Sequence, residues 1–165
     1  MTIAQRMLPE LDHEMATTRS LLAIVPDDKA DWRPHPKSMT LGELAKHVAD
    51  VASGLSRAVV GSAGVDFTTM PPREGYQGTS RMLADFDQGL AAFREALSQI
   101  SDESMMQTWT MSAGDKVFLS MPRVATLRTL IMNHMIHHRG QLSVYLRELD
   151  VPLPSIYGPT ADTPV

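Results

Sequence analysis

The sequence predicts an all-α fold, an antiparallel or crossover four-helix bundle with a small β-hairpin between its third and fourth helices. Apolar residues recur at spacings of three and four in four long segments, which are separated by connections rich in proline and glycine. After the third segment the helical period is lost, and two short runs flank a glycine-containing turn, as is typical of a hairpin. We expect residues 1–165 to form a single domain, because a chain of this length can bury a core without covalent staples.

The first helix is expected over residues 3–25 and ends before Pro26. Its core-facing stripe consists of Met7, Leu8, Leu11, Met15, Thr18, Leu22 and Val25. Residues 32–36 cannot lie inside a helix, because their two prolines lack backbone donors and bias the preceding residues away from the α region.

The second helix begins at a capping box, in which Thr40 is the N-cap and Glu43 bonds back to it. It is expected to reach about Val60, with a buried seam of Leu41, Leu44, Val48, Val51, Ala52 and Leu55. Residues 61–78 are rich in Gly, Pro and Thr and predict a long loop. Loops of this length inside a compact domain are usually functional or mobile.

The third helix is expected to start at a cap provided by Thr79 or Ser80 and to end near Ile100. Its apolar residues in helical register are Met82, Leu83, Phe86, Leu90, Phe93 and Leu97. Residues 108–111 and 117–120 predict the two strands of the hairpin. Because an isolated hairpin is marginally stable in water, we expect it to lie against the helices.

Pro122 suits the first position of the last helix, which is expected to run to about Leu149. The core-facing stripe of this helix is expected to be Val124, Leu127, Ile131, His134, His138, Gln141 or Leu142, and Tyr145. The tail, residues 152–159, is expected to be extended, and its Ile156 and Tyr157 could fold back onto the bundle.

The composition narrows the class of protein. Cysteine is absent, which excludes disulfides and thiolate metal sites and agrees with a reducing cytoplasm. The first ten residues contain no apolar run of signal-peptide length, and no segment approaches the roughly 20 apolar residues that span a bilayer. We therefore expect a cytoplasmic protein without a membrane partner.

A net charge of −4 with scattered basic residues argues against nucleic acid as a partner. Most of the twelve methionines are expected to fill the core, with an adaptable pocket or subunit surface as the alternative.

The most informative motif is a pair of histidines, His134 and His138, one turn apart in the last predicted helix. Side chains at i and i+4 share a helix face, so both imidazoles can approach one ion. His47 flanks the seam of the second helix and supplies a third nitrogen if the two helices face each other. Three imidazoles without cysteine are typical of a catalytic metal site with open positions. The alternative is that these histidines simply hydrogen-bond inside the core.

Each of four residues near these histidines has more than one possible role. His137 lies one position off the stripe and is expected to support a ligand or to lie at the surface. Asp50 is expected to be solvated, with support of an imidazole or replacement of a metal ligand as the alternatives. Gln141 bonds either a bound water or another helix. Arg139 lies off the stripe and is expected at the surface or an interface. Loop side chains expected to roof one end of the bundle are Trp32, Met39 and Tyr157.

Five segments, which together span nearly the whole chain, resemble the DinB-like (damage-inducible) superfamily: residues 31–34, 38–44 followed by His47, 133–141, 144–147 and 152–162. The resemblance implies a four-helix bundle with a crossover connection, often a homodimer, and a divalent metal held by three histidines. Carried over position by position, these metal ligands are His47, His134 and His138.

The resemblance extends to thiol transferases that use the metal to activate a low-molecular-weight thiol, and to isomerases that depend on such thiols. Our first hypothesis is a metal-dependent transferase or hydrolase, in which Zn, Ni or Fe activates a thiol or water against a small electrophile. The second is a non-catalytic, stress-related binding or scaffold bundle with a structural or opportunistic metal. The third hypothesis, action on nucleic acid, follows only from the family's name, and the net charge of −4 argues against it.

Overall fold

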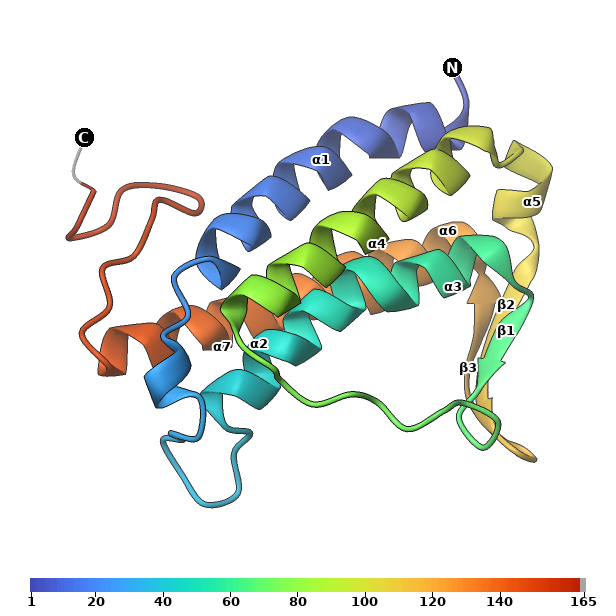
Figure 1. The fold of residues 1–165 in the computed structure, drawn as a ribbon. Helices are drawn as coiled ribbons and strands as arrows, with labels where there is room; N and C mark the ends of the chain where they lie inside the picture. Colours follow the sequence, from blue (N-terminus) through green and yellow to red (C-terminus); the bar gives the residue numbers. More distant parts are fainter. Residues whose placement is uncertain (164–165) are drawn as a thin grey trace.

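The computed structural model describes residues 1–163 and is mostly helical, with one small three-stranded sheet. Four long helical stretches lie side by side (Figure 1). They are α1 (Ile3–Leu22), α2 (Leu41–Asp50) continued by η2 (Val51–Leu55) and α3 (Ser56–Gly61), α4 (Thr79–Gln99), and α6 (Arg123–Thr126) continued by η3 (Leu127–Asn133) and α7 (His134–Glu148). In Figure 1, α2–α3 and α4 run in the same direction, because the chain between them returns along the molecule.

The helix starts follow local hydrogen bonding. In α2, the Thr40 hydroxyl oxygen accepts a bond from the Glu43 amide at 3.2 Å, and the Glu43 carboxylate accepts one from the Thr40 amide at 2.7 Å. This reciprocal pair is the predicted capping box, and it satisfies two amides that the first helical turn leaves free. Thr2 and Gln5 form the same arrangement at α1. Pro122 is the last residue of a strand and the residue before α6, one position earlier than predicted.

The sheet contains the predicted hairpin, β2 (Thr108–Ala113) and β3 (Lys116–Pro122), and one strand that the sequence pattern missed. This is β1 (Gly64–Asp66), which pairs in parallel with β2 inside the segment predicted as a loop. Three residues are too few to show a strand period, and their partner lies more than forty positions away. Gly64 is required there, because a Cβ would come within 2.4 Å of the Thr110 carbonyl oxygen. Two short elements were also missed: η1 (Asp27–Lys29) and α5 (Asp102–Met106).

Two segments, η2 and η3, have the wider π-helical turn and lie next to the helices that carry the histidines. A π turn contains more residues than an α turn, so it rotates the side chains that follow it. The buried face of α7 is therefore made of Met135, Arg139, Leu142 and Leu146, and the two histidines flank it. The predicted stripe placed His134 and His138 at its centre because it assumed one uninterrupted α period.

The prediction for Arg139 was wrong, because its side chain is 1% exposed. It donates to the carboxylate of Glu14 at 2.6 Å and to the Thr18 hydroxyl at 3.1 Å, so it ties α7 to α1. The tail folds back as expected, and the Tyr157 hydroxyl donates to the same Glu14 carboxylate at 2.8 Å. A buried guanidinium needs such partners, because an isolated charge in the core is costly.

The loop side chains divide between two places. Trp32 packs edge-to-face on Tyr145, with ring centroids 5.6 Å apart, and the Tyr145 hydroxyl donates to the Met39 carbonyl at 3.3 Å. This cluster closes one end of α7. Tyr157 instead belongs to the buried pair of Arg139 and Glu14 described above. None of the three lines the main pocket.

Helices α4 and η2 pack closely at Gly89. Replacing Gly89 with alanine places a Cβ about 2.7 Å from the Ser53 Cβ, so one of the helices must shift. We expect this substitution to lower the free energy of unfolding by about 1–3 kcal/mol, measured by urea denaturation. The matched control is Gly140→Ala in α7, where no atom lies within 4 Å. Equal effects of the two substitutions would contradict the close packing of η2 on α4.

No helix in residues 1–163 is both long enough and apolar enough to cross a membrane.

Candidate metal centre

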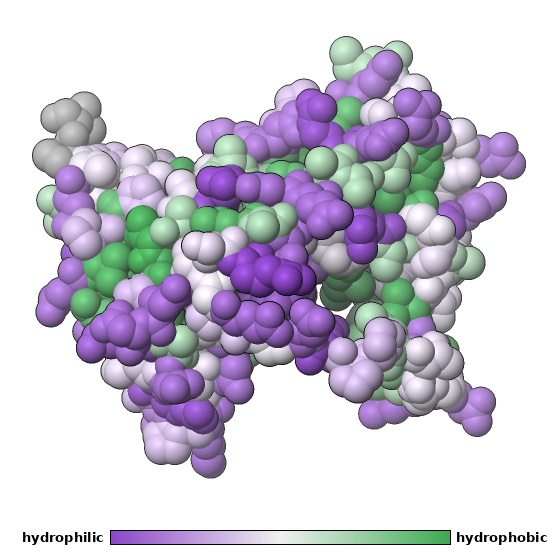
Figure 2. Space-filling view, in the orientation of Figure 1, coloured by the Kyte–Doolittle hydropathy of each residue, from purple (hydrophilic) through white to green (hydrophobic). Residues whose placement is uncertain are grey.

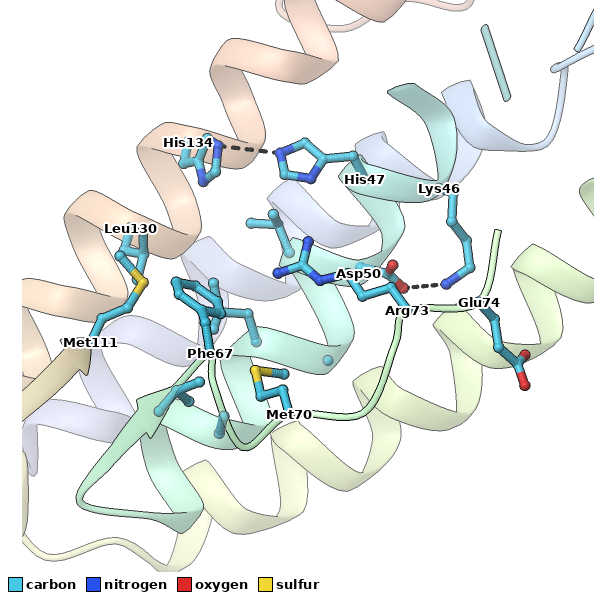
Figure 3. Close-up of a pocket in the computed structure, with 15 residues that line it drawn as sticks. Lys46, His47, Asp50, Phe67, Met70, Arg73, Glu74, Met111, Leu130 and His134 are labelled. Atoms are coloured by element: carbon cyan, nitrogen blue, oxygen red, sulfur yellow. Dashed lines mark hydrogen bonds and ion pairs between the residues drawn. The ribbon is translucent and has the colours of Figure 1, made fainter. Parts of the chain in front are cut away.

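The structure brings together the three predicted histidines. His47, from α2, and His134 and His138, from the first two turns of α7, each offer a ring nitrogen, and these atoms all lie within 4.8 Å of one another. The Nε2 atom of His134 is 3.3 Å from that of His47 and 2.8 Å from that of His138. Figure 3 shows the His47 and His134 rings pointing toward each other across the gap between their helices. Helices α2 and α7 therefore face each other where the prediction required it.

Gln141 sets the tautomer of His138. Its amide oxygen lies 2.7 Å from His138 Nδ1. Because an amide oxygen only accepts, Nδ1 carries the hydrogen, and Nε2 of the neutral ring presents a lone pair to the other two histidines. The described contact of the Gln141 amide oxygen is therefore with an imidazole on its own helix, a partner that the sequence analysis did not predict.

Burial favours the uncharged rings of His47 and His134. Burial first, and then the nearby charges of His138, His134 and Arg73, lower the pKa of His47 to about 4, against the opposing effect of Asp50. Burial and the neighbouring His138 also lower the pKa of His134, although the Leu130 backbone acts in the opposite direction. The neutral ring is the form that binds a metal ion, so both shifts leave these histidines ready as ligands at neutral pH.

Hydrogen bonds alone do not satisfy this cluster. His134 Nε2 faces two ring nitrogens, but a ring nitrogen has either one hydrogen or one lone pair. In residues 1–163, His134 Nδ1 is also buried without a hydrogen-bond partner. A divalent cation at the meeting point would accept the lone pairs of all three Nε2 atoms. The three histidines could therefore hold a metal ion, and imidazole is a donor that Zn, Ni and Fe accept.

Comparison with known proteins gives one consistent result. The sequence model of the DinB family matches residues 1–164. The chain belongs to the DinB family. It is 29% identical over 166 residues to the uncharacterized protein YrdA of Bacillus subtilis (strain 168), an alignment that covers 94% of this chain and 93% of that protein.

Solved structures of DinB-like proteins share the fold of this DinB protein. A DinB-like protein from Bacillus cereus ATCC 10987 superposes with a TM-score of 0.72 at 26% identity, over 94% of this chain and 98% of the other. The DinB-like protein YjoA from Bacillus subtilis gives a TM-score of 0.69 at 20% identity, over 92% and 97% of the two chains. The predicted family resemblance is thus confirmed along nearly the whole chain.

The other predicted residues of this DinB protein lie around the three histidines without joining them. His137 is exposed, and its ring centroid is 4.9 Å from that of His138. Asp50 forms an ion pair with Lys46 at 2.5 Å, one turn before it in α2, so its carboxylate is neutralised by a lysine. Asp50 is also partly exposed, which is close to the solvated carboxylate that was predicted.

A pocket of about 470 Å³ opens on His47 and His134. Figure 2 shows a hollow between the helices and the segment that follows β1, with hydrophobic surface at its base and hydrophilic surface around it. The predicted long loop contributes Phe67, Met70 and Arg73 to this pocket. The length of the loop predicted that it is functional or mobile, but it did not select these side chains, because nothing in the sequence shows which of them face inward.

Proposed function

We propose that this DinB-family protein is a metalloenzyme in which His47, His134 and His138 hold a divalent ion, and in which a thiol or water reacts with a small electrophile in the adjoining pocket. The observation that carries the proposal is the convergence of three imidazoles, two of which line the wall of a largely apolar cavity. A closed structural site would need no such cavity beside it. The pocket volume, about 470 Å³, suits a small molecule.

A bound divalent ion would supply Lewis acidity, which lowers the pKa of a thiol or water held there. Residues of the chain orient the metal ligands and line the pocket. Gln141 holds the His138 ring in the tautomer that exposes Nε2. The apolar wall of the pocket offers a surface for the hydrocarbon part of the electrophile. In the thiol reaction, sulfur bonds to the electrophilic carbon, the leaving group departs with its electron pair, and the thiol proton passes to solvent.

We infer further that the four long helical stretches form a four-helix bundle with its crossover between α3 and α4. The parallel course of α2–α3 and α4 in Figure 1 supports this arrangement. The crossover is made by the same segment that lines the pocket, so the connection has a functional reason to be long.

A screen with and without zinc tests the proposed enzyme. The full chain is treated with a chelator, part of it is reloaded with Zn²⁺, and both forms receive glutathione or cysteine together with 1-chloro-2,4-dinitrobenzene. We expect thioether product, measured by mass spectrometry, and a thiol-dependent rise in melting temperature only in the zinc-loaded form. If zinc raises the melting temperature but neither thiol nor electrophile adds to that rise and no product forms, the metal is structural and the second hypothesis of a non-catalytic bundle is favoured.

A further inference from the structure

The geometry points to Arg73 as the anchor for a carboxylate group of the molecule that enters the pocket. This inference deepens the proposed function, on which it rests for what happens to the bound molecule, by naming the class of substrate. The substrate is a small monoanion with an apolar body, whose carboxylate pairs with Arg73 while its other end lies toward the three histidines.

The pocket wall is apolar over most of its extent. Its apolar side chains come from η2 and α3, from β1 and the segment after it, from β2 and from η3, and the largest are Leu55, Phe67, Met70, Met111 and Leu130. Figure 3 shows Phe67 and Met70 on one side and Leu130 on the other. Burial of such a surface favours a ligand with a hydrocarbon body.

Four charged side chains line the pocket, and one of them, Arg73, has no charged partner in the described part of the chain. Lys46 and Asp50 neutralise each other in their ion pair. The Glu74 carboxylate points away from the cavity in Figure 3, whereas the Arg73 guanidinium points into it, below His47. Among residues 1–163, Arg73 takes part in no ion pair or side-chain hydrogen bond within the usual distances. The pocket therefore carries one positive charge without a protein partner among the described residues, and the solvent-exposed Arg73 presents it to an entering molecule.

The segment that carries Arg73 is fixed at both ends. At its start, the Asp66 carboxylate accepts bonds from the Thr68 amide at 2.9 Å and from the Gly114 amide at 3.1 Å, which attaches the segment to the hairpin turn. At its end, the Tyr76 hydroxyl donates to Asp27 at 2.5 Å, and the Tyr76 ring packs against Gly42 of α2. With both ends anchored, little ordering of the chain is needed to present the guanidinium to a ligand.

The shape and the single charge of the Arg73 guanidinium favour a carboxylate over a doubly charged phosphate. The planar guanidinium presents two parallel N–H donors, which match the two oxygens of a carboxylate. A single unpaired arginine neutralises one negative charge, and the other described cation that lines the pocket, Lys46, is already paired with Asp50. A doubly charged phosphate monoester is therefore disfavoured.

Binding of a matched pair of probes tests this site. The full chain, freed of metal with a chelator so that no carboxylate can bind a metal ion, is titrated by calorimetry with 3-phenylpropanoate and with the uncharged 3-phenylpropanamide. We expect the carboxylate to bind about tenfold more tightly than the amide, because it gains a charge-assisted pair of hydrogen bonds. In R73Q this preference disappears, while the affinity for the amide stays the same.

The control is R81Q, which removes an exposed arginine of α4 that does not line this pocket. It should keep the preference for the carboxylate. Equal affinity of the wild-type protein for the two probes, an unchanged preference in R73Q, or tighter binding of 2-phenylethyl phosphate than of 3-phenylpropanoate would each overturn the assignment.

The same protein samples separate the two proposals. Zinc content reports on the three histidines, and probe binding to the metal-free chain reports on Arg73. If zinc is not retained but R73Q loses the carboxylate preference, the proposed metalloenzyme fails and the carboxylate site stands. If zinc is retained and R73Q changes nothing, the carboxylate site fails and the assignment of the three histidines as metal ligands stands.

Discussion

Replacing His138 with alanine is expected to remove the metal from the purified protein while the helical fold remains. The ring nitrogen of His138 lies 2.8 Å from that of His134, so its loss takes away one of three converging donors. Because removing groups that merely support a ligand already costs 10–100-fold in affinity, loss of the ligand itself should cost more than about 100-fold. Elemental analysis of protein purified without a nickel column measures the metal, and circular dichroism measures the fold.

His137→Ala is the matched control for this experiment. His137 precedes His138 in α7, is exposed and does not belong to the converging group. It should retain as much metal as the wild-type protein. Stoichiometric metal in His138→Ala, or equal loss in the two variants, would contradict the assignment of His138 as a ligand.

Replacing Glu14 with alanine is expected to lower the free energy of unfolding by about 3–5 kcal/mol, because it leaves the buried guanidinium of Arg139 without its counter-ion. The pair is almost completely buried, with side chains 1% and 9% exposed. The tail loses a contact as well, since the Tyr157 hydroxyl bonds the same carboxylate. Urea denaturation, followed by circular dichroism, measures the loss.

Asp12→Ala provides the comparison, in the same helix and two residues earlier. Asp12 pairs with Arg94 of α4 at 2.7 Å, but both side chains are about half exposed. An exposed pair contributes less than about 1 kcal/mol, so this variant should be nearly as stable as the wild-type protein. A small effect of Glu14→Ala, similar to that of Asp12→Ala, would show that the buried pair does not hold α7 against α1.

Arg139 also bears on the metal centre through its place in the chain. It directly follows His138, and its bonds to α1 fix the face of α7 that turns toward the core. The neighbouring histidine is thereby directed to α2 rather than to solvent. The stability of this buried pair and the geometry of the three histidines are therefore linked through one helix.

The features that could be predicted from the sequence are those that depend on near neighbours in the chain. The capping box at Thr40 and Glu43 fixed the start of α2, and the spacing of His134 and His138 placed both imidazoles on one helix face. Apolar periodicity located the long helices, and the loss of that period located the hairpin. The convergence of His47 with the other two was a hypothesis about which helices meet, supported by resemblance to a family.

Other features depend on contacts between distant segments. Strand β1 exists because β2 lies beside it, and nothing in three residues signals that pairing. The π turns of η2 and η3 rotate the face of α7, which buries Arg139 where a regular period predicted exposure. Arg73 is one of several charged residues in a long connection, and only the packing of that connection against α2 and the hairpin directs it into the pocket.

By itself, the sequence determined the helical class, the start of α2 and the three imidazoles, because backbone hydrogen bonds and i to i+4 spacing act within a few residues. The tertiary structure alone decided which charges are buried in pairs and which one faces the pocket. The physical reason is that desolvation and charge pairing depend on the groups that surround a side chain in space, and those groups come from segments far apart along the chain.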